Sequence, residues 1–365
     1  MKYALSAHAA DVAKLLAESQ SIWEGALAGR MADDGCKLDL RGVKQLVTTM
    51  YMWAKPVTSG FGFLGGITGA AAALAFKSGV KKVEPGVEAS APAFRNAPLN
   101  MNLWEVQETC IEAASLVSVM ANASQGELIR GRFVREQQQD SIEVLAAGVG
   151  NEELLRERGI DPGQWCQRRP LHMVMVRGAP FQLYGHCLKE LSDKPRLTIT
   201  TSKHEGEWVW YIGGDVAETG VGRGEEEQIQ AAKLELSQCM PWITPAQYVS
   251  MRWATLRIDR AEGRMADGRR PDGPVVHLFG RTIAVWPTKL ALAPVAAKMV
   301  LEAVGTILAE SGLTKSGLTK SVDLVSGETP NTQASMHGVR RPTVSLAPWE
   351  QRDLKWKQAA QVEAL

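Results

Sequence analysis

Side chains that could take part in chemistry lie in and around an aromatic-rich segment in the middle of the chain. His186 follows a glycine, and Tyr211 stands beside two tryptophans in residues 208–212. A histidine can give or take a proton near neutral pH, and a tyrosine hydroxyl can donate or accept a hydrogen bond. His186, Tyr211 and also Tyr51 are therefore candidates for the lining of a pocket. His172, among apolar residues, is more typical of a hydrogen-bonded core histidine.

Such side chains need a sheet to position them, and the local pattern predicts one. Residues 169–178 contain an apolar run of strand length that ends at a glycine. Residues 196–201 alternate between apolar and polar, and a turn through Gly206 connects them to residues 208–212. This alternation, rich in β-branched and aromatic residues, predicts a β-hairpin in an antiparallel sheet. Its aromatic face could wall a pocket or form a packed core, and the pattern alone favours the core.

The composition limits which functions the chain can have. A chain of 365 residues can bury a sizeable core, and its 45% hydrophobic and 22% charged residues are those of an ordinary soluble protein. A net charge of +1 gives no reason to expect a nucleic-acid partner. The five cysteines lie far apart, which disfavours a disulfide framework and a zinc site and predicts a cytoplasmic setting. The sequence holds no nucleophile elbow, metal-ligand cluster or G-x-x-x-x-G-K loop, so no metal site is expected.

A glycine-rich run offers a second candidate for chemistry. Gly60-Phe61-Gly62-Phe63-Leu64-Gly65 fits the pattern G-x-G-x-x-G, whose glycines let a backbone approach a pyrophosphate at a helix N-terminus. However, residues 55–59 interrupt any strand leading into the glycines, and Glu84 is followed at once by Pro85. The pattern therefore favours a small-residue helix packed on the sheet over a dinucleotide site. A membrane span over residues 57–76 is disfavoured because glycine, serine and threonine lower its hydrophobicity.

The rest of the chain alternates between helical and extended patterns, which predicts a mixed α/β protein. Helices are expected over residues 4–30, 152–158, 225–240 and from Pro294 to about 308, and strands over residues 46–53, 142–145, 252–260 and 283–286. Residues 104–119 are mixed in pattern, with Leu116, Val117 and Val119 suggesting a helix. Beyond Pro330 the chain is polar, which predicts a surface tail anchored by Trp349.

Four segments together resemble the FAD-dependent oxidoreductases related to D-amino-acid oxidases and glycerol-3-phosphate dehydrogenases. They are residues 144–151 (VLAAGVGN), 169–214, 253–260 (WATLRIDR) and 286–294 (WPTKLALAP). The resemblance implies an α/β (mixed α+β) protein, in which an incomplete, Rossmann-like FAD-binding domain is interleaved with a substrate domain on a large mixed, mainly antiparallel sheet. We expect residues 1–45, 128–165 and 272–312 in the first domain, 46–127 and 166–271 in the second, and a loop and tail over 313–365.

The resemblance also implies roles for individual residues. Ala147, Gly148 and Gly150 would lie against the pyrophosphate and ribitol of FAD, unless they form only a close helix–strand packing turn. Thr288, Lys289 and Leu290, ahead of a helix beginning at Pro294, would place backbone N–H groups and a positive charge near an anionic flavin. Lys289 could equally be a solvated loop lysine.

Three residues are the expected catalytic set. Arg257 occupies the place where related enzymes often carry an arginine facing the substrate, and a guanidinium can hold a carboxylate in two parallel hydrogen bonds. His186 and Tyr211 complete the set, whereas Arg260, Arg269 and Arg270 are expected to be solvated.

The start of the chain departs from the family pattern. Family members begin with a strand, a G-x-G-x-x-G turn and a helix that grip the adenosine end of FAD, whereas Met1-Lys2-Tyr3-Ala4-Leu5 resembles family sequence downstream of that unit. We therefore expect an N-terminally truncated FAD-dependent oxidoreductase that acts on a small amine or hydroxy compound. The alternatives are a non-catalytic subunit of the same fold that binds no flavin and, more weakly, an NAD-type protein that uses Gly60 to Gly65. The oligomeric state is left open.

Overall fold

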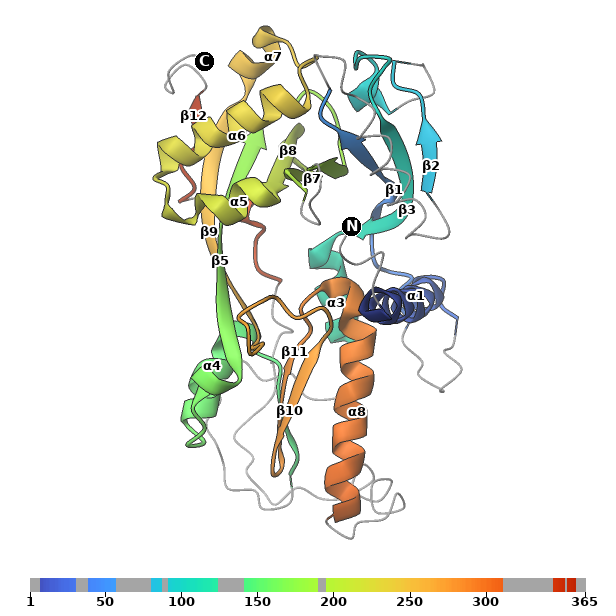
Figure 1. The fold of residues 1–365 in the computed structure, drawn as a ribbon, viewed down its shortest axis with the longest axis vertical. Helices are drawn as coiled ribbons and strands as arrows, with labels where there is room; N and C mark the ends of the chain where they lie inside the picture. The colour runs from blue at the N-terminus through green and yellow to red at the C-terminus, as the bar shows by residue number, and fades with distance from the viewer. Residues whose placement is uncertain are drawn as a thin grey trace, which may run out of the picture.

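The computed structural model describes residues 7–30, 39–56, 80–86, 91–123, 141–189, 195–310, 344–351 and 353–358. A large sheet lies at one end of the molecule and a small sheet at the other, and the long strands β5 and β9 run between them (Figure 1). Residues 57–76, which include the Gly60 to Gly65 run, lie outside the described residues. The dinucleotide, packing and membrane hypotheses for that run therefore stay predictions.

The large sheet has nine strands in the order β12-β9-β5-β8-β7-β6-β1-β3-β2. These strands are β1 Gln45–Ala54, β2 Val80–Val83, β3 Leu103–Ile111, β5 Cys166–Arg177, β6 Gly185–Leu188, β7 Leu197–His204, β8 Glu207–Gly213, β9 Arg252–Gly263 and β12 Lys357–Gln358. Every neighbouring pair is antiparallel except β1 and β6. The expected large mixed, mainly antiparallel sheet is therefore confirmed, as is the hairpin, because β7 and β8 pair with Thr200 opposite Tyr211.

The small sheet has three strands in the order β10-β11-β4, and β4 runs parallel to β11. Its strands are β4 Glu143–Leu145, β10 Val275–Phe279 and β11 Thr282–Trp286. The α-helices of the described residues are α1 Ala7–Leu27, α3 Ala113–Ala123, α4 Asn151–Arg156, α5 Asp215–Thr219, α6 Glu225–Cys239, α7 Pro245–Ser250 and α8 Ala293–Glu310. Short 3-10 turns are η1 Pro92–Phe94, η2 Gly148–Gly150, η3 Pro162–Gln164, η4 Gly220–Gly222, η5 Leu290–Leu292 and η7 Pro348–Glu350.

Strand alternation gives the large sheet two faces of different character. One, here called the Trp210 face, carries Trp53, Cys187, Leu197, Trp210 and Trp253 on strands paired in register. These side chains are fully buried and form the main core with residues of α6. The other, here called the Tyr211 face, carries the alternate residues, which include Met52, His186, Thr198, Tyr211, Met175, Leu171, Arg169 and Arg260.

Helices flank the small sheet on two sides. Leu155 of α4 packs against Leu145, Ala284 and Trp286, while α8 lies along the other side (Figure 1). Length and composition alone would allow one described stretch, Leu290–Glu310, to cross a membrane, and the core helix of a soluble protein meets the same criterion. The expected absence of a transmembrane segment and the cytoplasmic setting therefore stay predictions.

One expected helix is wrong in its first half. Residues 104–111 belong to β3, which pairs with β1, and only the apolar residues from Leu116 onward lie in a helix, α3. The sequence does not show a clear strand pattern here, because β3 lies one strand from the sheet edge and its residues Gln107 and Glu108 are exposed and polar. Pairing with β1 and burial of Leu103 outweigh the weak local preference.

Candidate active site at the sheet junction

Two loops meet at one edge of the small sheet. The parallel strands β4 and β11 are in register, with Leu145 opposite Ala284. Because parallel strands end at the same edge of a sheet, the turn η2 after β4 and the turn η5 after β11 leave from neighbouring positions. The structure therefore brings together the two segments in which the cofactor-binding residues are expected, Ala147 to Gly150 and Thr288 to Leu290.

The buried side chain of Asn151 ties these two strand ends together. Its Nδ2 donates to the carbonyl of Leu145 at 3.1 Å and to that of Val285 at 3.2 Å, and its Oδ1 accepts from the N–H of Ala147 at 2.7 Å. Ala147 and Gly148 remain exposed, and a Cβ added to Gly148, whose φ is +59°, would enter open space. Asn151 was missed from the sequence, although a polar residue directly after a run of small residues could have indicated it.

Thr288 stands in a strained turn. Its φ is +64°, a value that β-branched residues rarely adopt, and Lys289 N–H donates to the carbonyl of Pro287 at 2.6 Å across it. Thr288 Oγ1 donates to the carbonyl of Gly273 at 2.9 Å, and Arg270 donates to the carbonyl of Thr288 at 3.1 Å. Strained residues held in this way cluster at functional sites, so the turn is a candidate for holding a ligand.

Helix α1 holds the η5 loop from the side. Ser19 Oγ and Trp23 Nε1 both donate to the carbonyl of Ala291, the second at 3.2 Å, and Lys298 of α8 forms an ion pair with Glu18 at 2.9 Å. The carbonyl of Ala291 is therefore occupied by α1. The first N–H groups of the η5–α8 helical run have no acceptor within the helix, and they can bind an anion.

Lys289 adds a positive charge beside this helix start. Partial burial lowers its pKa first, then the nearby Arg270, while Asp272 and Glu108 raise it. More than a third of its surface is nevertheless reached by solvent, which fits a side chain in a recess open on one side.

His186 lies on the Tyr211 face beside the same acid. Its Nδ1 is 3.0 Å from Thr198 Oγ1, and burial lowers its pKa, while Glu108 acts in the opposite direction. The strand can bring His186 here only because Gly185 lies against the backbone of Tyr51, where a Cβ would collide with the Tyr51 carbonyl. Burial therefore favours the neutral imidazole of His186. Tyr51 itself turns the other way, against Phe94 of the core.

Tyr211 and Arg260 share the Tyr211 face further along the sheet. Burial raises the pKa of Tyr211, and the positive charge of Arg260 lowers it in part. Arg260 is 35% exposed, its pKa is lowered by burial and then by Arg270 and Arg169, and its Nε is buried without a hydrogen-bond partner. Glu218 lies 3.9 Å from Arg260 but also pairs with Arg169 at 3.1 Å. The cluster therefore keeps donors and positive charge available for an anion.

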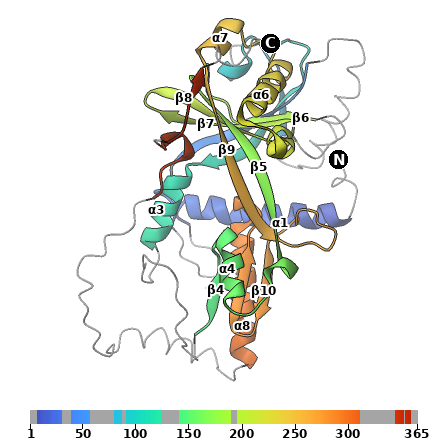
Figure 2. The same cartoon turned by 90° about the vertical axis from the view of Figure 1, so that its left-hand side faces the viewer.

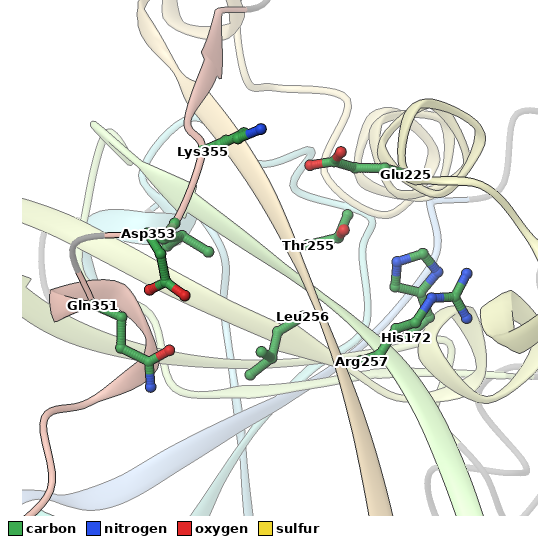
Figure 3. Close-up of a pocket in the computed structure, with 9 residues that line it drawn as sticks. His172, Glu225, Thr255, Leu256, Arg257, Gln351, Asp353 and Lys355 are labelled. Carbon is green, nitrogen blue, oxygen red and sulfur yellow. The ribbon is translucent and has the colours of Figure 1, made fainter.

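Arg257 does not join this cluster. It pairs across the strands with His172 on the Trp210 face, and its guanidinium donates to the carbonyls of Val221 at 2.6 Å and Arg223 at 2.5 Å. Figure 3 shows it beside His172 at a cavity of about 390 Å³ along the edge of β9. Arg257 fastens the η4 turn in this structure, and its expected contact with the substrate stays a prediction. His172, as expected, is buried, with Nδ1 3.1 Å from the Gly220 carbonyl.

The residues at the junction fit the flavin end of FAD. Gly148 leaves open space just after β4, and the strained Thr288 turn and the exposed Lys289 follow β11 at the same edge of the small sheet, where η2 lies close to β9. No strand–glycine turn–helix unit of the kind that grips adenosine is found among the described residues, whose gaps include residues 1–6 and 57–79. These residues are those that would hold the flavin end, and their contact with FAD stays a prediction.

The fold and this junction define the class of the protein: a mixed α/β protein of the flavin-oxidoreductase type. No protein-family model matches the chain. It is 37% identical over 312 residues to a probable FAD-dependent oxidoreductase of Pseudomonas aeruginosa, covering 80% of this chain and 75% of the relative. The crystal structure of that Pseudomonas aeruginosa oxidoreductase superposes with a TM-score of 0.67 at 32% identity, over 93% of this chain and 83% of the other.

These comparisons place the chain in a family. The crystal structure of iminodiacetate oxidase from Chelativorans sp. BNC1 has a TM-score of 0.50 at 12% identity, over 82% of this chain and 80% of the other, and shows the shared fold. The chain belongs to the FAD-dependent oxidoreductases, and to that extent the resemblance seen in its sequence is confirmed. FAD is the cofactor of this family.

Proposed function

We propose that the chain is an FAD-dependent oxidoreductase that oxidises a small amine or hydroxy compound bearing a carboxylate. FAD, when bound, supplies the acceptor for a hydride from a C–H bond of the substrate. The observation that carries the proposal is the meeting of the Gly148 turn and the Thr288–Leu290 loop at one sheet edge, facing the Tyr211 face. The substrate class is inferred from the unpaired Nε of Arg260.

Different residues of the chain would bind the cofactor and the substrate. The first N–H groups of η5, with Lys289, provide positive charge and donors for the flavin end. Arg260 binds the substrate carboxylate, because its Nε is buried without a hydrogen-bond partner and a guanidinium donates charge-assisted hydrogen bonds to a carboxylate. Tyr211, beside Arg260, orients the substrate, and neutral His186 can accept a proton from its amine or hydroxyl group.

Two glycine substitutions test the proposal. Gly148 and Gly159 both have positive φ, at +59° and +72°, and both leave open space where a Cβ would stand. Gly148→Leu and Gly159→Leu should therefore suffer similar backbone strain, but only the first would place a side chain in the proposed cofactor path. We expect the purified wild type and Gly159→Leu to retain FAD, seen as flavin absorbance after reconstitution, and Gly148→Leu to lose it.

The outcome also decides against the main alternative. A wild-type chain that stays colourless after reconstitution with FAD would contradict the proposal and favour a non-catalytic subunit of the same fold. Equal loss of FAD in both glycine variants would show that strain, and not occupation of a cofactor path, is the cause. Circular dichroism of each variant checks that the fold is kept.

A further inference from the structure

The register of the short strand β4 against β11 determines whether the Gly148 turn and the Thr288 turn meet. Three residues of β4 are paired with β11, and the pairs are Glu143 with Thr282, Val144 with Ile283 and Leu145 with Ala284. Among the described strands, β4 has a neighbour on one side only. A slip by one residue would move the Gly148 turn by about 3.3 Å and exchange the two faces of β4.

The apolar pattern around β4 does not define this register. Leu145 packs against Leu155 of α4, and Glu143, two residues before it, lies on the same side of the strand. The alternate positions on the opposite side are all apolar, and they are Ile142, Val144 and Ala146. In the observed register Val144 is 44% exposed. A slip by one residue would turn this wholly apolar set toward α4, so hydrophobic burial alone gives no reason to prefer the observed register.

A buried ion pair links β4 to α4 and to β11. The guanidinium of Arg158, just after α4, donates to both carboxylate oxygens of Glu143, and the Arg158 side chain is only 3% exposed. Arg158 also donates to the carbonyl of Leu154 in α4. Thr282 Oγ1 donates to Glu143 at 3.1 Å, so one carboxylate joins the first residues of β4 and β11. Figure 2 shows α4 and β4 together at the small-sheet end of the molecule.

The loss of this ion pair outweighs any apolar gain from a slip. In the slipped register the carboxylate of Glu143 would point to the other side of the sheet, and Arg158 would stay buried without it. One more buried methylene changes an equilibrium about fourfold, whereas a buried charge left unpaired changes it by on the order of a hundredfold or more. The ion pair therefore decides the register of β4.

We propose that Arg158 is a positioning residue, which acts through Glu143 to select the register of β4 that brings the Gly148 turn to the Thr288 turn. The ion pair serves the choice of register more than overall stability, because apolar residues of similar volume often replace a buried ion pair without loss of stability. The inference rests on the proposed function where it concerns FAD, whereas the register itself can be measured without a cofactor.

Labelling of introduced cysteines with N-ethylmaleimide reads the register directly, and peptide mass spectrometry follows it. Position 144 is exposed and position 145 is buried, so Val144→Cys should react about tenfold faster than Leu145→Cys. When Glu143→Leu and Arg158→Leu are added together, Val144→Cys should react about threefold more slowly and Leu145→Cys about threefold faster, because the faces of β4 are exchanged. A general loosening of the small sheet would instead make both sites react faster.

Two further variants are the controls for this labelling. Arg158→Lys keeps a positive charge beside Glu143 and should keep the wild-type order of reaction. Arg156→Leu removes an arginine of α4 that is 61% exposed and pairs with Glu152 at 3.5 Å, and it should also keep that order. Circular dichroism checks that each variant is folded. An unchanged order, or faster labelling at both sites, in Glu143→Leu/Arg158→Leu would overturn the proposal.

Fluorescence titration with FAD shows whether the register matters for the cofactor. Glu143→Leu/Arg158→Leu should bind FAD about tenfold more weakly than the wild type, because a displaced Gly148 turn no longer fits the Thr288 turn, and Arg156→Leu should bind it normally. If the labelling order changes but the affinity for FAD does not, the positioning role of Arg158 is overturned and FAD binding stands. If the wild type binds no FAD, the proposed function fails, and the labelling still decides whether Arg158 sets the register.

Discussion

The two faces of the large sheet are made from the same strands, yet they are built for different purposes. On the Trp210 face, Trp53, Trp210 and Trp253 are fully buried under α6. On the Tyr211 face, the alternate residues include His186, Tyr211 and Arg260, which remain partly exposed. A stable core needs apolar surface to be removed from water, whereas a binding site needs polar groups that are placed but not fully satisfied. The comparison teaches that alternation alone supplies both.

The difference between the faces also separates Arg257 from Arg260. Two arginines three residues apart on one strand must point to opposite faces. Arg257 found carbonyl partners on the helix-covered side, in η4 and the residue after it, while Arg260 kept a buried Nε without an acceptor. An unsatisfied charged donor in a partly desolvated place is costly unless a ligand completes it. The proposed position of the substrate rests on this difference between the two arginines.

The largest expected effect is a difference in stability between two neighbouring residues, one on each face of the sheet. Trp210→Ala should lower the free energy of unfolding by about 3–5 kcal/mol, because it leaves a large cavity in the main core. Tyr211→Ala, one residue on, should lower it by less than about 1.5 kcal/mol, because the side chain is partly exposed and lies outside that core. Urea unfolding followed by circular dichroism measures both. Similar losses would show that the Tyr211 face is also core.

A second test compares the two arginines. Arg260→Lys should weaken acetate binding to the FAD-loaded chain by about 10- to 100-fold, because a lysine cannot reproduce the guanidinium fork. Arg257→Lys should leave acetate binding unchanged and lower the free energy of unfolding by about 1 kcal/mol, through weaker bonds to the η4 carbonyls. Titration by the flavin spectrum and urea unfolding separate these outcomes, and the reverse pattern would place the substrate on the Trp210 face.

A smaller effect is expected at the strained turn. Thr288→Gly relieves the positive φ but loses the hydrogen bond to Gly273, so the two changes, each of about 1 kcal/mol, should nearly cancel in unfolding. Affinity for FAD should nevertheless fall several-fold, because the turn that directs Lys289 becomes less rigid. Flavin fluorescence titration checks this. A large loss of stability with unchanged FAD affinity would make the turn purely structural.

The smallest expected effect concerns pH. Burial lowers the pKa of His186, as well as those of His172 and His277, below the usual 6.5. Between each lowered pKa and 6.5 the unfolded chain binds more protons than the folded one, so stability should fall as the pH drops from about 7.5 to 5. His186→Gln should flatten this dependence modestly. Urea unfolding at several pH values measures it, and a steeper slope in the variant would contradict the assignment.

Much of the fold could be predicted from local pattern. The hairpin of β7 and β8, the strands β1, β5, β9 and β11, and the helices α1, α6 and α8 all carry regular spacing, and the structure confirms them. The strand β3 was missed because its outward residues are polar at a position near the sheet edge. Which domain each segment belongs to stays a prediction, as do the roles of Ala147, Gly150 and Leu290 toward FAD.

The sequence by itself determined the type of the regularly spaced elements, though not of β3, and, through resemblance, the family. Periodicity and small-residue runs are local properties, so they can be seen in a linear chain. Tertiary structure alone decided which face of each strand stays partly exposed. It also decided that Asn151 joins the ends of β4 and β11 and that Trp349 contacts Tyr211, which lies 138 residues earlier in the chain. These contacts depend on the strand register and on which face of the sheet α6 covers. The residue spacing within a single segment does not determine either of them.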